Sequence, residues 1–525
     1  MENNIVLQGS DCPDIPAEKF KPAVRQDLAH DKKLDTKPIG YFKGAFIRFC
    51  KNKGSVVAAC IILLLILFAI FVPIFTPYTV SYYDNNYVNA LPRNRLFEKT
   101  SFWDGCEEVK NVGLINFTID YAKGQETGYN AIKDQKYTEN DGSYTYRQDS
   151  IHKVGCIYQN VSAEEFADIQ KYQDETGKQV IYPTVDPQDR PKNQDGKNAN
   201  YYFKTEIGRG GKTQIVFDEE GKIIPVYWEY EAGTVDDGYT SKKRIEGESG
   251  FERDGKTYFY RYSNIAGSGY EIRINYYEYY IYRHTYVNKD GIKAPYFLFG
   301  CEKQGKDILT CLASGARFSF LFAIAVAVVN MIVGAIYGSI AGYYGGKADL
   351  IMERISDILS AIPMMIVITL LKLHMGGSSH VLVLFLSFFL TGWIGMAGTT
   401  RMQFYRYKNQ EYVLAARTLG AKDKRLMFKH IFPNAIGTLV TSCALVIPSM
   451  IYSEINLSYL GIINLSTGDI TSVGTLINAG QSAMSQFPHA VAIPVVYLVL
   501  LMLSFNLFGN GLRDAFNPSL RGTEG

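Results

Sequence analysis

Hydrophobic residues are concentrated in six runs that are each long enough to cross a bilayer. A helix needs about 20 apolar residues to span roughly 30 Å of hydrocarbon. The third run is interrupted by Glu353, Arg354 and Asp357, so its apolar core is expected to begin near Ile355. The runs are 56–75, 318–341, 350–371, 381–400, 435–452 and 490–508. This pattern predicts a polytopic α-helical membrane protein with six transmembrane helices.

Basic residues indicate which connections face the cytoplasm. Lysine and arginine recur through residues 43–53, before the first run, and eight of them lie within 401–429, between the fourth and fifth runs. The positive-inside rule places both segments in the cytoplasm, and six spans put the C-terminus with Arg513 there too. The first run lies beyond 50 residues of tail and lacks a small-x-small cleavage site, so it is interpreted as a retained span.

The tail contains an amphipathic pattern. Phe42, Phe46 and Phe49 recur at helical spacing beside Lys43 and Arg48, which is typical of a helix that lies in the membrane surface. The alternative is a disordered basic tail.

Residues 78–312 separate the first two runs and contain no apolar stretch that could cross a bilayer. The segment is predicted to be an extracellular domain, because long translocated domains largely escape the charge rule. Ser162 and Glu165 form a capping box for a helix through Tyr172. Its latter half favours strands, at 213–217 and 222–230 around an acidic turn.

Two further signals complete the α+β prediction for this segment. Asp254-Gly255 is typical of a hairpin turn, and the tyrosine-rich residues 270–287 are expected to be extended. The tyrosines favour cross-strand packing over a binding surface. Cys106, Cys156 and Cys301 allow one disulfide in three pairings, of which Cys106 with Cys156 is the first choice, or none if the source is anaerobic. None of them forms a metal-binding Cys-x-x-Cys motif.

Composition excludes several function classes. The formal net charge of +2 argues against a nucleic-acid binder. Residues 300–306 have the spacing of a phosphate-binding loop, but Asp307 replaces the Ser or Thr that would bind magnesium. His374 and His380 are interpreted as solvated rather than metal-bound. We find no catalytic motif, so no catalytic, cofactor or metal site is predicted.

A polar hairpin between the fourth and fifth runs is the strongest candidate for function. Glu411 begins a helix in which Ala415 and Ala416 permit close approach of another surface, and Gly420 ends it. A second, basic helix is expected to follow until Pro433, which lacks a backbone donor. The segment is therefore predicted to be a docking element.

At these residues the chain resembles the membrane-spanning permease subunits of ATP-binding-cassette importers, whose cytoplasmic loop reads Glu-Ala-Ala, three residues, Gly, then Ile-x-Leu-Pro. Leu414 stands where that pattern has Glu, and Glu411 is the acid offered instead; Phe432 replaces the usual Leu. Segments 299–319, 454–461 and 509–518 are similar to the oligopeptide and dipeptide branch. The resemblance does not extend into the segment between the first two spans.

The resemblance implies a type I importer permease and its partners. These are a homologous permease subunit, two ATPase subunits that hold ATP and magnesium, an extracellular substrate-binding lipoprotein, the peptide and membrane lipid. Contact with the ATPases is implied for Glu411, Ala415, Ala416, Arg417, Gly420 and Pro433. Together with the hydropathy pattern, the resemblance gives the predicted domains, in which the outer domain rests on the residue pattern alone. They are a tail at 1–53, a first helix at 54–77, an outer α+β domain at 78–312, a five-helix core at 313–511 with the coupling loop at 401–434, and a cytoplasmic end at 512–525.

Polar residues within the spans are candidates for a substrate path. Placing a polar side chain in hydrocarbon costs free energy, and such side chains often have a function. The candidates are Arg317, Asn330 and Glu454. Two of them, Arg317 and Glu454, lie near the ends of spans, where a structural role is at least as plausible as contact with substrate. Small residues recur at three- and four-residue intervals and favour close packing against another span. They are Gly334, Gly338, Ala341 and Gly342.

The sequence thus predicts a non-catalytic permease subunit of a bacterial cell-membrane importer for oligopeptides or dipeptides. Two alternatives stay open. The cargo could be nickel, an opine or a glycoside, because cargo choice resides largely in the separate binding protein. A different class is a membrane receptor that senses a ligand through its outer domain.

Overall fold

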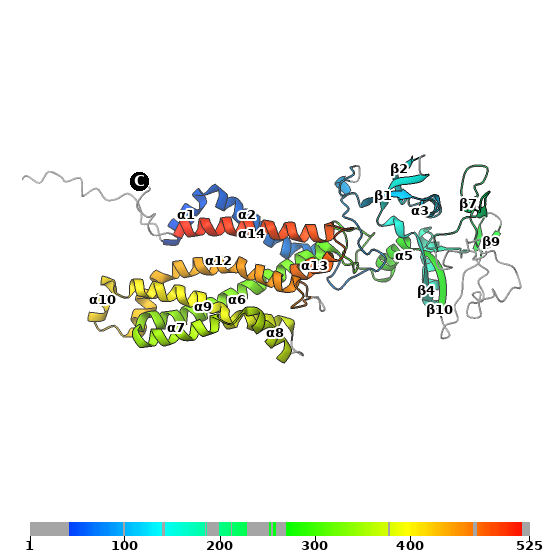
Figure 1. Ribbon diagram of the computed structural model, residues 1–525. Helices are drawn as coiled ribbons and strands as arrows, with labels where there is room; N and C mark the ends of the chain where they lie inside the picture. The colour runs from blue at the N-terminus through cyan, green and yellow to red at the C-terminus, as the bar shows by residue number, and fades with distance from the viewer. Residues whose placement is uncertain are drawn as a thin grey trace, which may run out of the picture.

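A bundle of long helices and a mixed helix-and-strand segment lie end to end in the computed structural model of this chain (Figure 1). We call residues 76–307, which join helices α2 and α6, the insert, and the remaining helices the bundle. The structure describes residues 41–97, 100–138, 142–183, 185, 199–211, 213–227, 251–253, 256–258, 269–375, 379–465 and 470–516.

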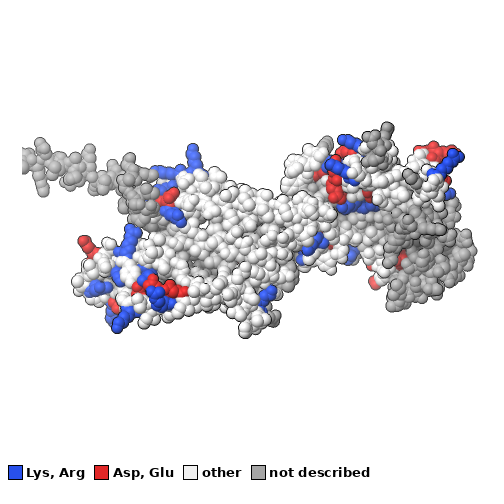
Figure 2. Space-filling view, in the orientation of Figure 1, with Lys and Arg blue, Asp and Glu red and all other residues white. Residues whose placement is uncertain are grey.

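The apolar runs form the bundle. Within the described residues, five helices are long and apolar enough to cross a membrane. Figure 2 shows a broad surface free of Lys, Arg, Asp and Glu along the middle of the bundle, with charged residues gathered at the end that holds α10 and over the insert. The five are α2 (Lys53–Phe75), α6 (Ile308–Tyr344), α9 (His380–Tyr407), α14 (His489–Phe516) and the continuous helical segment Asp423–Tyr459, most of which is α12 (Phe432–Tyr459).

The predicted third span is wrong as a single helix. It is divided into α7 (Gly346–Ser360) and α8 (Met364–His374), which meet at an angle of 73°. Pro363 stands at the junction as the N-cap of α8. Proline removes a backbone donor and disfavours helical geometry in the residue before it, so the helix cannot continue through this position.

The small residues of α6 pack directly against α9, as predicted. A Cβ atom on Gly334 would lie 2.6 Å from the carbonyl oxygen of Trp393, and one on Gly342 would lie 2.7 Å from that of Arg401. Gly338 similarly faces Ala397. Residues without side chains allow the two backbones to approach closely.

The same contacts show that α6 and α9 run in parallel, because successive glycines of α6 meet successive positions of α9 in the same order. Two parallel helices must be joined by a connection that returns along the bundle. The bent pair α7 and α8 is that connection, and α8 lies toward the insert end (Figure 1). The described residues therefore pass along the bundle six times if the bent pair α7 and α8 is counted as one broken span.

Helix α1 (Tyr41–Lys51) packs against the end of α14. The Arg48 guanidinium donates to the carbonyl oxygen of Ala515 at 2.7 and 3.0 Å. The ring of Phe49 meets that of Phe508 edge-on at 5.3 Å, whereas Phe46 is exposed. The predicted helix forms, with one aromatic face against the bundle and another outward.

The insert is built from short strands and helices. Among the described residues of the insert, two three-stranded antiparallel sheets have the orders β1-β3-β2 and β4-β10-β5, and two hairpins are β6-β7 and β8-β9. The strands are β1 (Cys106–Val112), β2 (Ile132–Thr138), β3 (Ser143–Asp149), β4 (Cys156–Ser162), β5 (Ile181–Tyr182), β6 (Thr205–Ile207), β7 (Thr213–Ile215), β8 (Phe251–Arg253), β9 (Lys256–Tyr258) and β10 (Gly269–Asn275). Helices α3 (Leu114–Thr127) and α4 (Ala163–Thr176) accompany them.

Several local predictions for the insert are confirmed. Ser162 accepts a hydrogen bond from the Glu165 amide at the start of α4, which continues to Thr176. The acidic turn closes with a bridge between Phe217 and Ile223. Strands β8 and β9 pair as the predicted hairpin, although its Asp254-Gly255 turn lies outside the described residues. The expected strand 222–230 does not form over its described residues 222–227, which make only isolated bridges at Ile223, Pro225 and Tyr227, and 228–230 lie outside the described residues.

The extended prediction for residues 270–287 is wrong beyond Asn275. Helix α5 (Tyr276–Tyr282) begins there, capped by the Asn275 side chain, and continues as a π-helix (Arg283–Val287). Tyr279, Tyr282 and Tyr286 contact one another at helical spacing. Burial of one aromatic face against the insert core outweighs the β-propensity of tyrosine.

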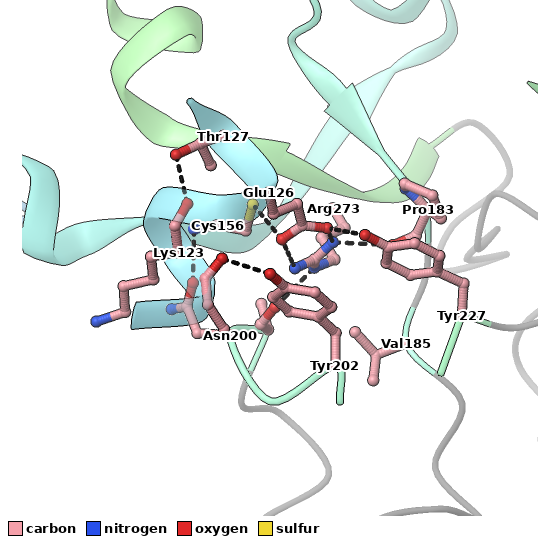
Figure 3. A network of polar contacts seen from close by, with 12 residues as sticks. Lys123, Glu126, Thr127, Cys156, Pro183, Val185, Asn200, Tyr202, Tyr227 and Arg273 are labelled. Carbon is pink, nitrogen blue, oxygen red and sulfur yellow. Dashed lines mark hydrogen bonds and ion pairs between the residues drawn. The ribbon is translucent and has the colours of Figure 1, made fainter. Parts of the chain in front are cut away.

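A buried ion pair joins the two halves of the insert (Figure 3). Arg273 on β10 pairs with Glu126 on α3 at 2.5 Å, and both side chains are almost fully buried. The Arg273 Nε atom donates to the carbonyl oxygen of Ala199 at 2.6 Å, and Tyr227 donates to Glu126 at 2.6 Å. Arg273 and Glu126 thus form hydrogen bonds with several different segments of the insert. The pair therefore fixes the positions of these segments relative to one another.

The preferred disulfide is wrong. Cys106, Cys156 and Cys301 are all free thiols. Cys106 begins β1 and Cys156 begins β4, which belong to different sheets, and the Cys156 sulfur lies 3.7 Å from Glu126. Burial raises the pKa of the Cys106 thiol to about 11 and raises that of Cys156 as well, so both are protonated at neutral pH.

The insert is closely fitted to the bundle where α6 begins. Asp307 is the buried N-cap of α6 and accepts hydrogen bonds from the amide and hydroxyl of Thr310 at 2.9 and 2.6 Å. Burial raises the pKa of Asp307 to about 6. Gly305 has a φ of +77° and meets the backbone of Asp84, leaving no room for a side chain. The junction is therefore rigidly packed.

Candidate functional site

The predicted hairpin lies at the end of the bundle opposite the insert (Figure 1). Helix α10 (Glu411–Thr418) follows α9, and α11 (Asp423–Arg425) begins the returning arm. Gly420 has a φ of +82°, and its amide donates to the carbonyl oxygen of Arg417 at 2.9 Å, while the Ala421 amide donates to Ala416 at 3.1 Å. A glycine at this left-handed position ends α10, as predicted.

The first helix of the hairpin begins at Glu411, as predicted, but the coupling loop predicted at 401–434 is bounded differently on both sides. Helix α9 continues through Arg401 to Tyr407, because the Arg401 charge is neutralised within the bundle. At the other end, a π-helix (Leu426–Ile431) leads directly into α12. Pro433 therefore lies in the first turn of α12, where its missing N–H group is tolerated, and does not end the helix.

One side of the hairpin is buried against the ends of α6 and α9. Val413, Leu426 and Ile431 join Tyr343 of α6 and Phe404 of α9 in one hydrophobic cluster. Burial of several large apolar side chains holds the hairpin as a body on these two helices.

Polar contacts reinforce this seat. The Tyr343 hydroxyl donates to Asp423 at 2.6 Å, and the Arg417 guanidinium carbon lies 6.0 Å from the centre of the Tyr343 ring. Asn434 donates to the Tyr412 hydroxyl at 3.1 Å, which joins the two arms. The end of α6 is thus connected to both α10 and α11.

The opposite side of the hairpin is open. Glu411, Leu414, Ala415 and Gly420 are exposed, and Leu419 is 88% exposed. Ala416 is half-buried and Arg417 exposed. A tip that combines small residues with a fully protruding leucine is suited to enter a groove on another protein.

An ion-pair cluster lies beneath the hairpin. Arg401 of α9 binds Asp349 of α7 through two hydrogen bonds of 2.5 and 2.6 Å, and Glu353 at 3.0 Å. The Tyr405 hydroxyl also donates to Asp349 at 2.6 Å. A planar guanidinium matched to a carboxylate gives directional pairing, so α7 is attached to the same body as α9.

The predicted path residues do not form one site. Glu454 of α12 is fully buried and accepts hydrogen bonds from Ser319 of α6 at 2.5 Å and from Ser458 at 3.1 Å. Arg317 lies two residues from Ser319 and is exposed. Asn330 is buried and donates to the carbonyl oxygen of Phe388 at 3.4 Å, about 16 Å further along α6 at 1.5 Å per residue.

Sequence reasoning missed three residues of the hairpin site. Tyr343 and Asp423 were not singled out, because they are far apart in the chain and only the fold brings them together. Leu419 was not singled out either. A leucine beside the terminating glycine, within a basic segment, was the available signal that an apolar side chain protrudes there.

Two family models match the chain. Residues 334–522 match the binding-protein-dependent transport system inner membrane component, and residues 40–92 match the N-terminal transmembrane domain of oligopeptide transport permease C. The oligopeptide transport system permease protein OppC of Bacillus subtilis is 40% identical over 235 residues, which are 45% of this chain and 76% of the relative. The chain belongs to the family of binding-protein-dependent transport system inner membrane components. Its predicted role as a transport subunit rather than an enzyme is confirmed.

A second relative covers a similar share of this chain. The dipeptide transport system permease protein DppC of Bacillus subtilis is 37% identical over 42% of this chain and 69% of its own length. Among solved structures, the MetNI methionine ABC transporter in an inward-facing form covers 39% of the chain at 14% identity with a TM-score of 0.31. Residues 93–333, which include most of the insert, are not matched by either family model.

Proposed function

We propose that this chain is the transmembrane permease subunit of an ATP-driven importer that translocates oligopeptides or dipeptides delivered by an external binding protein. The names of its relatives support peptides as cargo. The observation that carries the mechanism is the hairpin, with one side packed on α6 and α9 and the other side exposed at the end of the bundle.

In this proposal the exposed side of the hairpin docks into an ATPase subunit. Ala415 and Gly420 allow close approach, Leu419 fills an apolar pocket, and Glu411 and Arg417 provide charges at the rim. Ala416 and Pro433 support the shape of the two arms. ATP and magnesium bind to two partner ATPases, and a homologous permease subunit completes the pore.

The contacts within the chain suggest how movement would be transmitted. A displacement of α10 acts on α6 through Tyr343 and Asp423. Because the glycines of α6 contact the α9 backbone directly, α6 and α9 have little freedom to slide separately. The ion pairs of Arg401 add α7 to the moving unit. Rigid-body displacement of such a unit is a recognised means of switching a packed bundle between two states.

Orientation follows from the same proposal. The hairpin, α1 and the end of α14 face the cytoplasm of a bacterial cell, where basic residues are favoured. The insert then lies outside and stands where an external binding lipoprotein would deliver its cargo. Arg317, Asn330 and Glu454 are retained as candidates for the translocation path, with Glu454 also joining α6 to α12.

A matched pair of substitutions tests the docking surface. Ala415, in the middle of α10, and Ala348, in the first turn of α7, are both exposed alanines near the end of the bundle opposite the insert. Ala415→Asp is expected to abolish co-purification of the ATPases and ATP-dependent peptide uptake, whereas Ala348→Asp should retain both. Normal uptake by Ala415→Asp would refute the docking assignment, and failure to recover any ATPase with the unaltered chain would favour a receptor.

A further inference from the structure

A loop at the base of the insert exposes an unusual amount of apolar surface. We call Arg95–Phe97 and residues 100–103 the aromatic loop. Leu96 is 86% exposed and Phe102 is 66% exposed, with Phe97 also exposed beside them. Contiguous apolar groups on a surface mark contact with another apolar phase more often than isolated ones do.

The aromatic loop is held in a defined conformation. The Thr100 hydroxyl lies 2.8 Å from the Phe97 carbonyl oxygen and 3.1 Å from that of Phe102. The Trp103 indole donates to the carbonyl oxygen of Leu298 at 2.6 Å, and its ring meets that of Phe102 edge-on at 5.6 Å. The exposed side chains are therefore presented by a fixed scaffold and do not gain burial by folding back.

The loop stands beside the lipid-facing ends of two bundle helices. Phe102 and Trp103 share a groove of about 430 Å³ with Ala492 and Ile493, in the first two turns of α14. Beyond them, exposed residues of α14 continue the apolar face. They are Val495, Val496 and Val499.

A second hollow joins the loop to α2. Arg95 and Phe75, the last residue of α2, line a hollow of about 470 Å³. Ile74 and Phe75 are both exposed. The blue loop between the bundle and the insert in Figure 1 lies close to the insert end of α14. The aromatic loop thus continues the exposed apolar faces of α2 and α14 at the insert end of these helices.

We propose that the aromatic loop is a membrane anchor that inserts Leu96 and Phe102 into the interfacial zone of the phospholipid leaflet on the insert side. Aromatic residues are favoured at this depth, where an apolar ring contacts acyl chains and polar groups remain hydrated. The exposed Arg95 is placed to meet lipid phosphates. The position of the loop beside α2 and α14 favours lipid over a soluble protein, which would reach the far end of the insert first.

The anchor would give the insert a second attachment besides its junction with α6. A body held at two points has fewer orientations over the bundle than one held at a single junction. This inference depends on the lipid-facing surfaces of α2 and α14 and not on the identity of the cargo, so it stands or falls separately from the proposed transport of peptides.

Site-specific photocrosslinking tests the anchor directly. The photoreactive residue p-benzoylphenylalanine would replace Leu96, Phe102 or Ile207 in the full chain with its co-purifying subunits, in phospholipid nanodiscs. Ile207 is the matched control, because it is 81% exposed on β6, which pairs with β7 in the part of the insert far from the bundle (Figure 1). All three side chains are exposed, so the substitutions should not prevent folding.

The expected result is a phospholipid adduct, identified by mass spectrometry, at positions 96 and 102 with a yield several-fold above that at 207. Equal yields at the three positions, no lipid adduct at 96 and 102, or crosslinking of these positions to a protein subunit would overturn the proposal.

Discussion

Leu419 offers the sharpest test of the hairpin, because its side chain does nothing visible within the chain. It is 88% exposed, so Leu419→Asp should change the free energy of unfolding by no more than about 0.5 kcal/mol. If an ATPase groove buries the exposed part of this leucine, its loss removes about 2 kcal/mol of binding free energy. That corresponds to a roughly 30-fold weaker complex, and a buried aspartate would weaken it further.

The assay measures the two quantities separately. Thermal unfolding of the purified chain in detergent reports stability, and titration of nanodisc-embedded permease with the ATPase subunits reports affinity. Leu373→Asp is a suitable control, since Leu373 is also strongly exposed but lies on α8, toward the insert end of the bundle.

Unchanged ATPase affinity in Leu419→Asp would refute the reasoning, because a leucine that the ATPase groove buries must contribute to binding. A large loss of stability would also contradict it, since that would show that Leu419 contributes to the fold of the chain itself.

Three further predictions concern packing and charge. Gly334→Val should lower the free energy of unfolding by about 1–3 kcal/mol, because the added side chain overpacks the contact with α9. Gly395 has open space around it, so Gly395→Val should leave the free energy of unfolding unchanged. Because burial raises the pKa of Asp307 from 3.8 to about 6, the stabilising effect of its neutral form is complete below pH 3.8 and is lost as the pH rises through about 6. In the unaltered chain the free energy of unfolding should therefore fall by about 3 kcal/mol between about pH 4 and pH 7. Asp307→Asn should remove this fall. Arg273→Met should cost about 3–5 kcal/mol by stranding the buried Glu126, and adding Glu126→Gln should restore part of the resistance of the insert to proteolysis.

The bundle could be predicted well because its signals are local. Each long apolar run can be recognised without knowledge of its neighbours. The spacing of the glycines in α6 also predicted close packing against another span. Pro363 lies inside the predicted third span, but the prediction was based on hydropathy and did not take this proline into account. The proline interrupts the helix even though the residues around it are apolar.

The errors arose where tertiary packing decides. Tyr276–Tyr282 has residues that favour strands, yet burial of its rings against the insert core makes it a helix. Pro433 signals a helix end by itself, but the preceding π-helical turn shifts it into the first turn of α12. In the hairpin, Gly420 was found from its own chemistry, whereas the bond from Tyr343 to Asp423 joins residues that only the fold makes neighbours.

The central claim is that the hairpin transmits work from an ATPase to α6 and α9. A structure of the assembled complex, determined by electron cryomicroscopy in nanodiscs, would test it most directly. The account predicts Ala415 and Leu419 within a groove of an ATPase subunit, with Tyr343 and Asp423 still bonded behind them. A hairpin left in solvent, or an ATPase seated on another part of the bundle, would contradict it.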